Sequence, residues 1–208
     1  MPMDLELYGN LVDLKSSAEK YYPDLQKILS NPKTMNHLKY MAHLNEGGWT
    51  IDQVQEREKK WKEGQRKGTD LHFLVHLKES GAVAGTCGFK HIDLMHKTAE
   101  FGLIVHYPFW GKGAAAECHL LALEYGFSKL DLHKIRFETF VTNVRMRRFY
   151  ENIGIQLESI AKEALFEDGH FVDNAVYVLF DRDWPCIKEK LQEKFRGQFQ
   201  QGNPPATL

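Results

Sequence analysis

The fold is decided by residues 109–117, with the sequence FWGKGAAAE, because they join a predicted strand to a predicted helix. The strand spans residues 98–106, and the helix begins near Ala114. Gly111 and Gly113 allow the backbone to come close to a ligand, and the dipole of the helix favours an anion at its N-terminus. The stretch therefore indicates a site for the phosphates of a nucleotide-like cofactor, although an ordinary strand-to-helix turn has a similar composition.

Composition and charge limit the classes of protein to which the chain can belong. Its 208 residues are 43% hydrophobic and 26% charged, which is typical of one globular domain with a sizeable core. We place that domain at residues 1–197 and expect a disordered tail at residues 198–208. The net charge of −1 gives no electrostatic reason to expect nucleic acid or a membrane surface as a partner.

The cysteines and the N-terminus favour a cytoplasmic protein. The three cysteines are widely spaced and odd in number, as expected of free thiols in a reducing compartment. The chain begins with no charged-then-apolar leader, and no apolar run approaches the length of a membrane span. The spacing of histidines does not predict a metal site, because His72 and His76 lie too far apart on a strand to share one ion.

Hydrophobic periodicity divides the rest of the chain into alternating strands and helices, as in an α/β protein. The predicted strands are residues 5–14, 71–77, 82–89, 98–106, 135–141, 155–165 and 171–179. The predicted helices are residues 24–29, 51–68, about 114–130 and about 144–153. Turns are predicted at residues 78–81 and at Asp168-Gly169. Glu117, in the first turn of its helix, is expected to interact favourably with the helix dipole.

A dinucleotide-binding fold is one alternative for the glycine loop. Gly111, Gly113 and Ala116 formally satisfy its fingerprint, and Glu138 lies somewhat beyond the expected acidic position. That fingerprint requires a preceding strand-helix-strand unit, whereas this loop follows strands that read as antiparallel hairpins. The sequence also lacks the Gly-Lys-Ser/Thr of a P-loop. The first observation argues against a dinucleotide-binding fold, and the second argues against a P-loop.

A second motif gives the chain its resemblance to a known family. Asn143, Tyr150 and Gly154 follow the strand after the loop, and an Asp-Gly-His hairpin comes after them. With the loop, this arrangement resembles the GNAT superfamily of N-acetyltransferases, and within it the ribosomal-protein N-terminal and spermidine acetyltransferases. The resemblance covers residues 70–184 well. Two positions depart from the family pattern, Trp110 in place of Gln or Arg and Ile155 in place of Phe.

The resemblance implies a GNAT fold, which is a mixed, mostly antiparallel sheet flanked by helices with one splayed parallel strand pair. Those strands would be residues 101–106 and 135–141, with the pantetheine arm of acetyl-CoA in the gap between them. Backbone groups of the loop would bind the pyrophosphate, and Asn143 would touch the pantetheine, act as a helix N-cap, or do both. The implied cofactor-binding residues are Ile104, Val105, Trp110, Gly111, Lys112, Gly113, Ala114, Ala115, Ala116 and Asn143.

Two proton movements are needed to acetylate an amine. The amine must lose a proton, and the departing CoA thiolate must gain one. The resemblance places Tyr150 as the donor to sulfur, although a tyrosine on the apolar face of a helix is also a common core residue. Glu100, a carboxylate in an otherwise apolar strand, is our candidate base; a structural carboxylate is the alternative. His106 is a weaker candidate for the base.

The resemblance therefore implies an enzyme that transfers acetyl from acetyl-CoA to a primary amine by direct attack in a ternary complex, and we expect no metal. A non-catalytic acyl-CoA-binding module on the same fold is the alternative. The acceptor is a small-molecule amine or a protein N-terminus, and a homodimer is left open. Residues 29–68 and 166–173 would select the acceptor. The carboxylates Glu167, Asp168 and Asp173 either attract a cationic acceptor or belong to a solvated turn.

Overall fold

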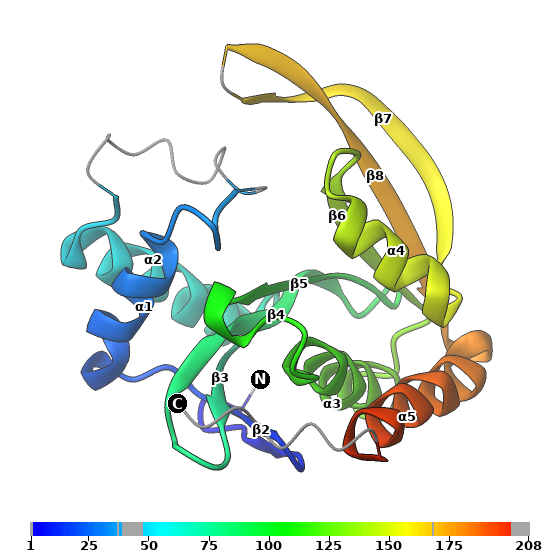
Figure 1. Ribbon diagram of the computed structural model, residues 1–208, viewed down its shortest axis with the longest axis horizontal. Helices are drawn as coiled ribbons and strands as arrows, with labels where there is room; N and C mark the ends of the chain where they lie inside the picture. Colours follow the sequence, from blue (N-terminus) through cyan, green and yellow to red (C-terminus); the bar gives the residue numbers. More distant parts are fainter. Residues whose placement is uncertain (1, 37, 39–47, 168, 201–208) are drawn as a thin grey trace.

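The computed structural model (Figure 1) describes residues 2–36, 38, 48–167 and 169–200, with residues 194–200 as backbone alone. Its centre is an eight-stranded sheet in the order β1-β2-β3-β4-β5-β6-β8-β7. The strands are β1 (Leu7–Tyr8), β2 (Val12–Lys15), β3 (Leu71–Leu77), β4 (Val83–Asp93), β5 (Thr98–Val105), β6 (Lys134–Phe140), β7 (Gln156–Glu167) and β8 (His170–Phe180). The helices are α1 (Tyr22–Leu29), α2 (Ile51–Lys67), α3 (Ala114–Ser128), α4 (Val144–Ile153) and α5 (Trp184–Gln200).

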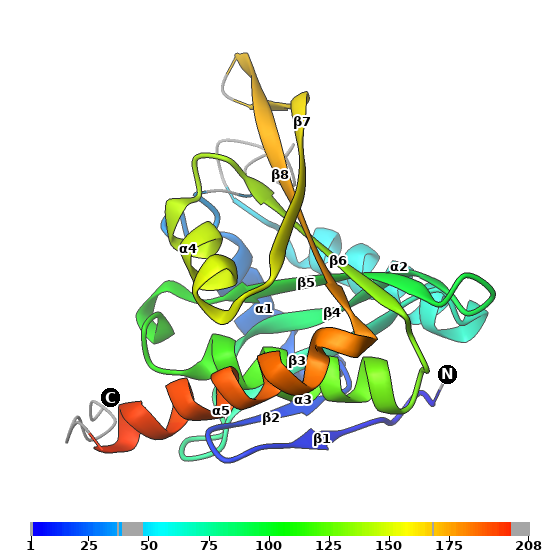
Figure 2. The same cartoon turned by 90° about the vertical axis from the view of Figure 1, so that its right-hand side faces the viewer.

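Helices cover both faces of the sheet (Figures 1 and 2). On one face, α1 and α2 enclose a small core that contains Val54, Leu74 and Ile104. On the other face, α3, α4 and α5 pack over a larger core that contains Phe101 and Phe137. Because side chains alternate along a strand, β5 contributes to both cores, with Phe101 on one face and Ile104 on the other. In the described part of the chain, no helix has the length and apolar character of a membrane span.

The sheet is antiparallel throughout except between β5 and β6, which run parallel. This parallel pair is short, because its described pairing joins residues 98–100 to residues 134–136 and ends there. Beyond that point β5 continues to Val105 and β6 to Phe140, and the two strands separate on the side of the glycine loop. The predicted α/β class, mostly antiparallel sheet and splayed parallel pair are confirmed.

Local sequence signals explain where two of the helices begin and end. Thr50 and Gln53 form a capping box at the start of α2, and Gly68 ends this helix in the left-handed conformation. Asn143 caps α4 by accepting a hydrogen bond from the backbone N–H of Met146. Gly154 ends α4 with a φ of 92°.

The N-terminal segment differs from the single strand predicted at residues 5–14. It forms two short strands, β1 and β2, joined by a turn in which the N–H of Gly9 donates to the carbonyl of Val12 at 3.0 Å. The carboxylate of Glu117 accepts the next three backbone N–H groups, those of residues 10–12. Because a side chain on α3 satisfies these donors, the strand is interrupted there.

The sequence prediction missed helix α5. The signals are present in the sequence, since Pro185 stands in the first turn and Trp184, Ile187 and Leu191 recur at helical spacing. All three apolar side chains are buried in the larger core. The boundary predicted for a disordered tail, at residue 198, falls inside α5, and residues 201–208 lie outside the described part of the chain.

Strands β7 and β8 form a long hairpin that projects from the body of the molecule (Figures 1 and 2). Near its turn, the exposed side chains of Phe166 and Phe171 contact each other with their ring centroids 5.1 Å apart. Gly169 in the turn has a φ of 82°. Asp168, the other residue of the predicted turn, lies outside the described residues.

Candidate active site

The glycine loop leads from the end of β5 to the start of α3. Gly111 and Gly113 have φ values of 79° and 85°, in the left-handed region that glycine adopts readily. Gly113 is the N-cap residue of α3, and no side chain caps this helix. The first backbone N–H groups of α3 are therefore available to an anion, and the helix dipole favours one there.

Trp110, one of the two residues that depart from the pattern of the resembled family, ties the loop to the strand before it. Its indole Nε1–H donates a hydrogen bond to the carbonyl of Val105 at 2.6 Å. The guanidinium of Arg145, on α4, lies over the indole with its Cζ 4.7 Å from the ring centroid. Trp110 thus joins β5, the loop and α4 at one point.

The other predicted cofactor-binding residues line the same end of β5 and the start of α3. Ile104 and Val105 are nearly buried at the strand end, and Ala114 and Ala116 pack into the larger core. Ala115 is half-buried, and Lys112 is exposed with its Nζ 5.8 Å from the ring centroid of Phe109. The structure therefore brings these residues together around one loop.

Asn143 lies at the start of α4 and is a helix N-cap, one of the two roles expected for it. Its side-chain oxygen accepts from the N–H of Met146 at 3.2 Å, and its side-chain nitrogen donates to Thr139 at 3.0 Å. These bonds fix the amide at the end of β6, where this strand has left its pairing with β5.

Tyr150 lies on α4 in a cluster of aromatic rings. Only 4% of the residue is exposed, and its neighbours include Phe137, Phe149 and Tyr177. Burial raises the pKa of Tyr150 well above its ordinary value. At neutral pH the phenol therefore keeps its proton, as a proton donor must before it acts.

The sequence analysis did not single out His119, which belongs to the same cluster. Its ring lies 5.9 Å from that of Tyr150, and its Nδ1 is 2.7 Å from the carbonyl oxygen of Ala115. The other ring nitrogen, Nε2, is buried without a hydrogen-bond partner among the described residues. Burial lowers the pKa of His119 to about 4, so the ring is neutral at physiological pH. A histidine on the apolar face of α3 was the available signal.

Glu100 lies on the opposite face of the sheet from Tyr150. It is the last residue of β5 that pairs with β6, and its partner there is Arg136. A carboxylate oxygen lies 3.4 Å from His91 Nδ1, and the side chain is partly exposed. By strand alternation Glu100 shares its face with Gly102 and Ile104. The sheet therefore lies between the candidate base and the candidate acid.

Gly102 forms an open position on the floor of that face. It is exposed, and a Cβ added there would meet no atom of the described residues within 4 Å. Along the strand, Gly102 lies between Glu100 and Ile104, on the face of the sheet against which α1 and α2 pack.

His106, the weaker candidate base, has a structural partner. Its Nδ1 lies 2.9 Å from the hydroxyl of Thr34, which also accepts the N–H of Tyr107 at 3.0 Å. Burial, together with the charge of Lys27, lowers the pKa of His106. The residue ties the segment after α1 to the end of β5.

Glu117 does more than interact with the helix dipole. Its side chain is buried, and its two oxygens accept backbone N–H groups of Asn10, Leu11 and Val12 at 2.6, 2.6 and 2.8 Å. The first turn of α3 is thereby anchored to the turn between β1 and β2. Sequence alone could not show this contact, because the two segments are more than a hundred residues apart.

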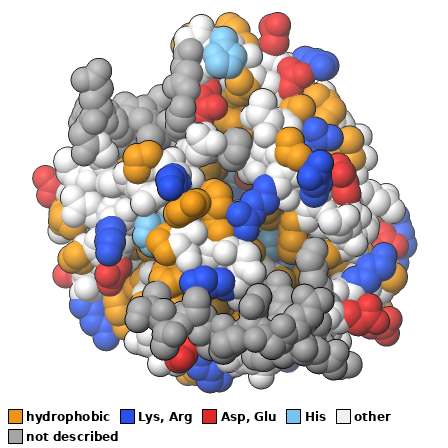
Figure 3. Space-filling view, viewed as in Figure 1, with side chains coloured by type: hydrophobic (Ala, Val, Ile, Leu, Met, Phe, Trp, Pro, Cys, Tyr) orange, Lys and Arg blue, Asp and Glu red, His pale blue; other side chains and the backbone are white. Residues whose placement is uncertain are grey.

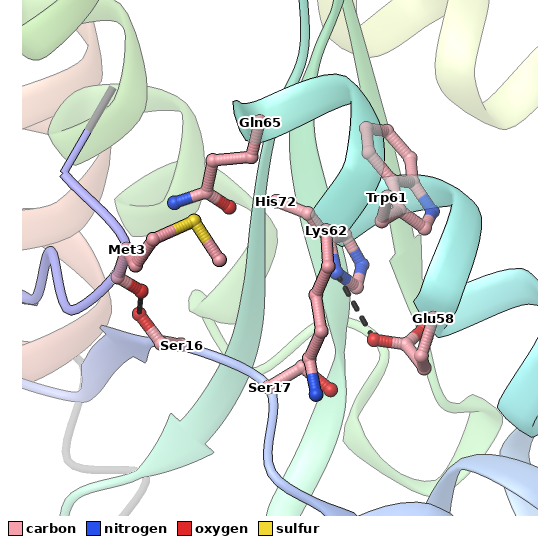
Figure 4. Close-up of a pocket in the computed structure, with 8 residues that line it drawn as sticks. All are labelled: Met3, Ser16, Ser17, Glu58, Trp61, Lys62, Gln65 and His72. Carbon is pink, nitrogen blue, oxygen red and sulfur yellow. Dashed lines mark hydrogen bonds and ion pairs between the residues drawn. The ribbon is translucent and has the colours of Figure 1, made fainter. Parts of the chain in front are cut away.

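A separate small pocket lies beneath α2 (Figure 4). Burial opposes ionisation of Glu58 in its wall, but interactions with His72 and Arg57 outweigh this effect and hold its pKa at about 2. His72 Nδ1 lies 3.3 Å from Glu58, and Trp61 stacks on the His72 ring with centroids 4.5 Å apart. These contacts join α2 to β3. The described residues contain no cluster of three or more His, Cys, Asp or Glu side chains that could hold a metal.

None of the three cysteines is placed as an activated nucleophile. Cys87 on β4 and Cys118 on α3 are both buried. Burial raises the pKa of the Cys118 thiol. Cys186 is exposed on α5, in the first turn of that helix. A thiol needs a lowered pKa to attack efficiently at neutral pH.

Comparison with known proteins identifies the family. The sequence pattern described as an acetyltransferase (GNAT) domain matches residues 13–156. The chain belongs to the GNAT acetyltransferase family. The resemblance stated from the two motifs is confirmed. As a GNAT acetyltransferase, the chain carries the glycine loop, both ends of the splayed strands and α4 inside the region that the family pattern covers.

Individual relatives agree with this assignment. The GNAT chain is 29% identical to the uncharacterized N-acetyltransferase p20 of Bacillus licheniformis over 118 residues, covering 57% of this chain and 66% of the relative. It is 30% identical to spermidine N(1)-acetyltransferase of Escherichia coli over 103 residues, covering 50% of this chain and 54% of the relative. The matched regions thus span less than two thirds of the length of these relatives.

A solved structure shows the same fold over almost its whole length. Spermidine N-acetyltransferase from Vibrio cholerae, in complex with CoA and spermine, superposes with a TM-score of 0.73 at 22% identity. The superposition covers 85% of this chain and 99% of that structure. The GNAT fold therefore extends beyond the stretches that the sequence comparisons match.

Proposed function

We propose that this GNAT acetyltransferase moves the acetyl group of acetyl-CoA to a primary amine by direct attack within a ternary complex. One observation carries the proposal: β5 and β6 separate beside the uncapped N-terminus of α3. An open helix N-terminus suits a pyrophosphate, and the gap between the strands suits the thioester arm attached to it. The Vibrio cholerae relative, which is described in complex with CoA, supports the choice of cofactor.

The main chain would hold most of the cofactor. Backbone N–H groups of residues 112–116 would bind the pyrophosphate, so alanine at three of these positions is compatible with the role. The arm would pass along Ile104 and Val105, whose side of β5 faces the gap. Asn143, fixed at the end of β6 by its two hydrogen bonds, would touch the pantetheine.

Two side chains on opposite faces would move the protons. Glu100 would remove a proton from the incoming ammonium, directly or through water, so that the nitrogen lone pair attacks the thioester carbon. Collapse of the tetrahedral intermediate breaks the carbon–sulfur bond, and Tyr150 would donate its proton to the leaving thiolate. The attacking nitrogen would then lose its second proton, which would return to the phenol through water, while Glu100 releases the first proton to solvent. The amide and free CoA are the products. No acyl-enzyme forms, in keeping with the buried Cys87 and Cys118.

The acceptor would reach the gap over Gly102, and we keep two chemical classes for it, a small-molecule amine and a protein N-terminus. Relatives that acetylate spermidine support the first class. The carboxylate of Asp173 gives this class less support than the sequence suggested, because it already pairs with Lys162 at 2.7 Å. Glu167 also has a partner, and Asp168 lies outside the described residues.

Binding is tested first, by thermal unfolding with acetyl-CoA and with NAD as the control. A ligand at a hundred times its Kd stabilises the native state by about 2.7 kcal/mol, which raises the midpoint by roughly 5–10 °C in a domain of this size. A rise with acetyl-CoA alone supports the proposal. The absence of any rise with acetyl-CoA contradicts it.

Turnover is tested next, by detecting free thiol with a panel of primary amines and peptides. Tyr150→Phe and Glu100→Gln should each lower kcat by about 10²- to 10⁴-fold, the usual contribution of a general acid or base. Tyr125→Phe and Glu158→Gln are matched controls on other surfaces and should leave kcat unchanged. If Tyr150→Phe and Glu100→Gln also leave it unchanged while acetyl-CoA still binds, the two assigned roles are wrong.

A further inference from the structure

Arg145 is a cation that lies beside the glycine loop. It is exposed on α4, and no carboxylate in the described part of the chain pairs with it. Two residues further along, Arg147 is fully engaged by Tyr177, the carbonyl of Val141 and Glu151. The two arginines therefore differ, because the guanidinium of Arg147 is held by hydrogen bonds and an ion pair and that of Arg145 is not.

The side chain of Arg145 is held in place by the indole of Trp110. Its guanidinium stacks on the indole of Trp110, with Cζ 4.7 Å from the ring centroid. One terminal nitrogen lies 3.8 Å from the place where a Cβ on Gly111 would stand. The indole is itself fixed by its bond to Val105. A side chain that normally has many rotamers is therefore directed at the mouth of the loop.

Helix electrostatics make this placement unfavourable in the free protein. Arg145 is in the first turn of α4, where the positive end of the helix dipole repels a cation. The first turn contains no acidic residue that would compensate. The uncapped N-terminus of α3 adds a second positive field at the same place. An anion bound between the two helix ends would remove this repulsion.

We propose that Arg145 binds a phosphate group of CoA, adding a side-chain contact to those that the loop backbone makes. The inference rests on the proposed function, because it requires CoA at this loop. A guanidinium forms paired hydrogen bonds with phosphate oxygens, and its exposed edge is free to do so while its face stays on the indole. Figure 3, which has the same view as Figure 1, shows Lys and Arg side chains beside an apolar patch near the middle of the molecular surface.

The test measures the Kd of CoA by isothermal titration calorimetry for the wild type and for Arg145→Gln. Arg148→Gln is the control, because Arg148 is an exposed arginine on the same helix for which the structure shows no contact with the loop. Arg145→Gln should weaken CoA about 10- to 100-fold, as expected for the loss of a charge-assisted contact, and Arg148→Gln less than about 2-fold. The thermal midpoint of ligand-free Arg145→Gln should stay the same or rise, since a repulsion is removed.

Dephospho-CoA, which lacks the 3′-phosphate, distinguishes the two phosphate sources. If Arg145→Gln weakens CoA but not dephospho-CoA, Arg145 binds the 3′-phosphate; if it weakens both equally, Arg145 binds the pyrophosphate. The inference is overturned if Arg145→Gln binds CoA within about 2-fold of wild type, or if both variants weaken it equally. Failure of the wild type to bind CoA would instead refute the proposed function.

Discussion

Glu117→Gln tests the anchor between α3 and the N-terminal turn. The substitution keeps the size of the side chain and changes one terminal oxygen into an NH₂ group. In the structure both oxygens are used, one by Asn10 and the other by Leu11 and Val12. The amide oxygen of a glutamine can still accept the N–H groups of Leu11 and Val12. Its NH₂ group then faces the N–H of Asn10, and two donors cannot form a hydrogen bond with each other.

The magnitude follows from these three bonds. A hydrogen bond to a charged group contributes about 1.5–3 kcal/mol and a neutral one about 1 kcal/mol. Glu117→Gln loses one charged bond and weakens two others, and water reaches the N–H of Asn10 at the exposed turn. We expect the free energy of unfolding to fall by about 3 kcal/mol, which lowers the thermal midpoint by roughly 6–12 °C.

Urea unfolding of wild type, Glu117→Gln and Glu124→Gln measures this loss. Glu124 is a control on the same helix, where it accepts hydrogen bonds from Trp184 and Lys188 at the surface. Its substitution should reduce the free energy of unfolding by about 1 kcal/mol or less. A loss for Glu117→Gln below about 1 kcal/mol, or no larger than that of Glu124→Gln, would refute the assigned anchoring role.

Three further substitutions have distinct signatures. Burial lowers the pKa of His119 to about 4 from 6.5, so its stabilisation is complete above pH 6.5 and is lost as the pH falls toward 4, by up to roughly 3 kcal/mol. His119→Phe should flatten the pH dependence of urea unfolding between pH 4 and 7; an unchanged slope argues against a buried neutral ring. Gly102→Val should raise the KM for the amine while leaving the Kd of CoA and the thermal midpoint nearly unchanged, and an unaltered KM would mean that the acceptor takes another path. Trp110→Phe removes the bond to Val105 and should lower the midpoint by about 2–4 °C in thermal unfolding, with no shift expected if that bond is unimportant.

Much of the fold could be predicted because its signals are local. Glycines in left-handed conformations, the cap at Asn143 and the alternation along β5 and β6 are all visible within short windows of sequence. The N-terminal strand was predicted as one piece because its interruption depends on Glu117, far away in the sequence. Helix α5 was missed although its apolar spacing is regular, because the family motifs end before it.

The candidate site divides in the same way. The loop and Tyr150 could be named because two sequence motifs resemble those of the GNAT family. His119 and Arg145 could not be assigned a place from sequence, because each acquires its environment from another element. His119 is enclosed by rings from β5, β6 and α4, and Arg145 rests on a loop indole.

The shortness of the parallel pairing between β5 and β6 has a mechanical consequence. Two halves of the sheet meet along a seam of only three residue pairs, so backbone hydrogen bonds alone leave their relative angle weakly constrained. Behind the seam, α3 from one half packs against α5 from the other, and Glu124 receives hydrogen bonds from Trp184 and Lys188. The contact between α3 and α5 therefore limits the movement of the two halves on the face of the sheet that carries the larger core. Substitutions at the contact between α3 and α5 should alter the separation between β5 and β6, although they change none of the residues that line it.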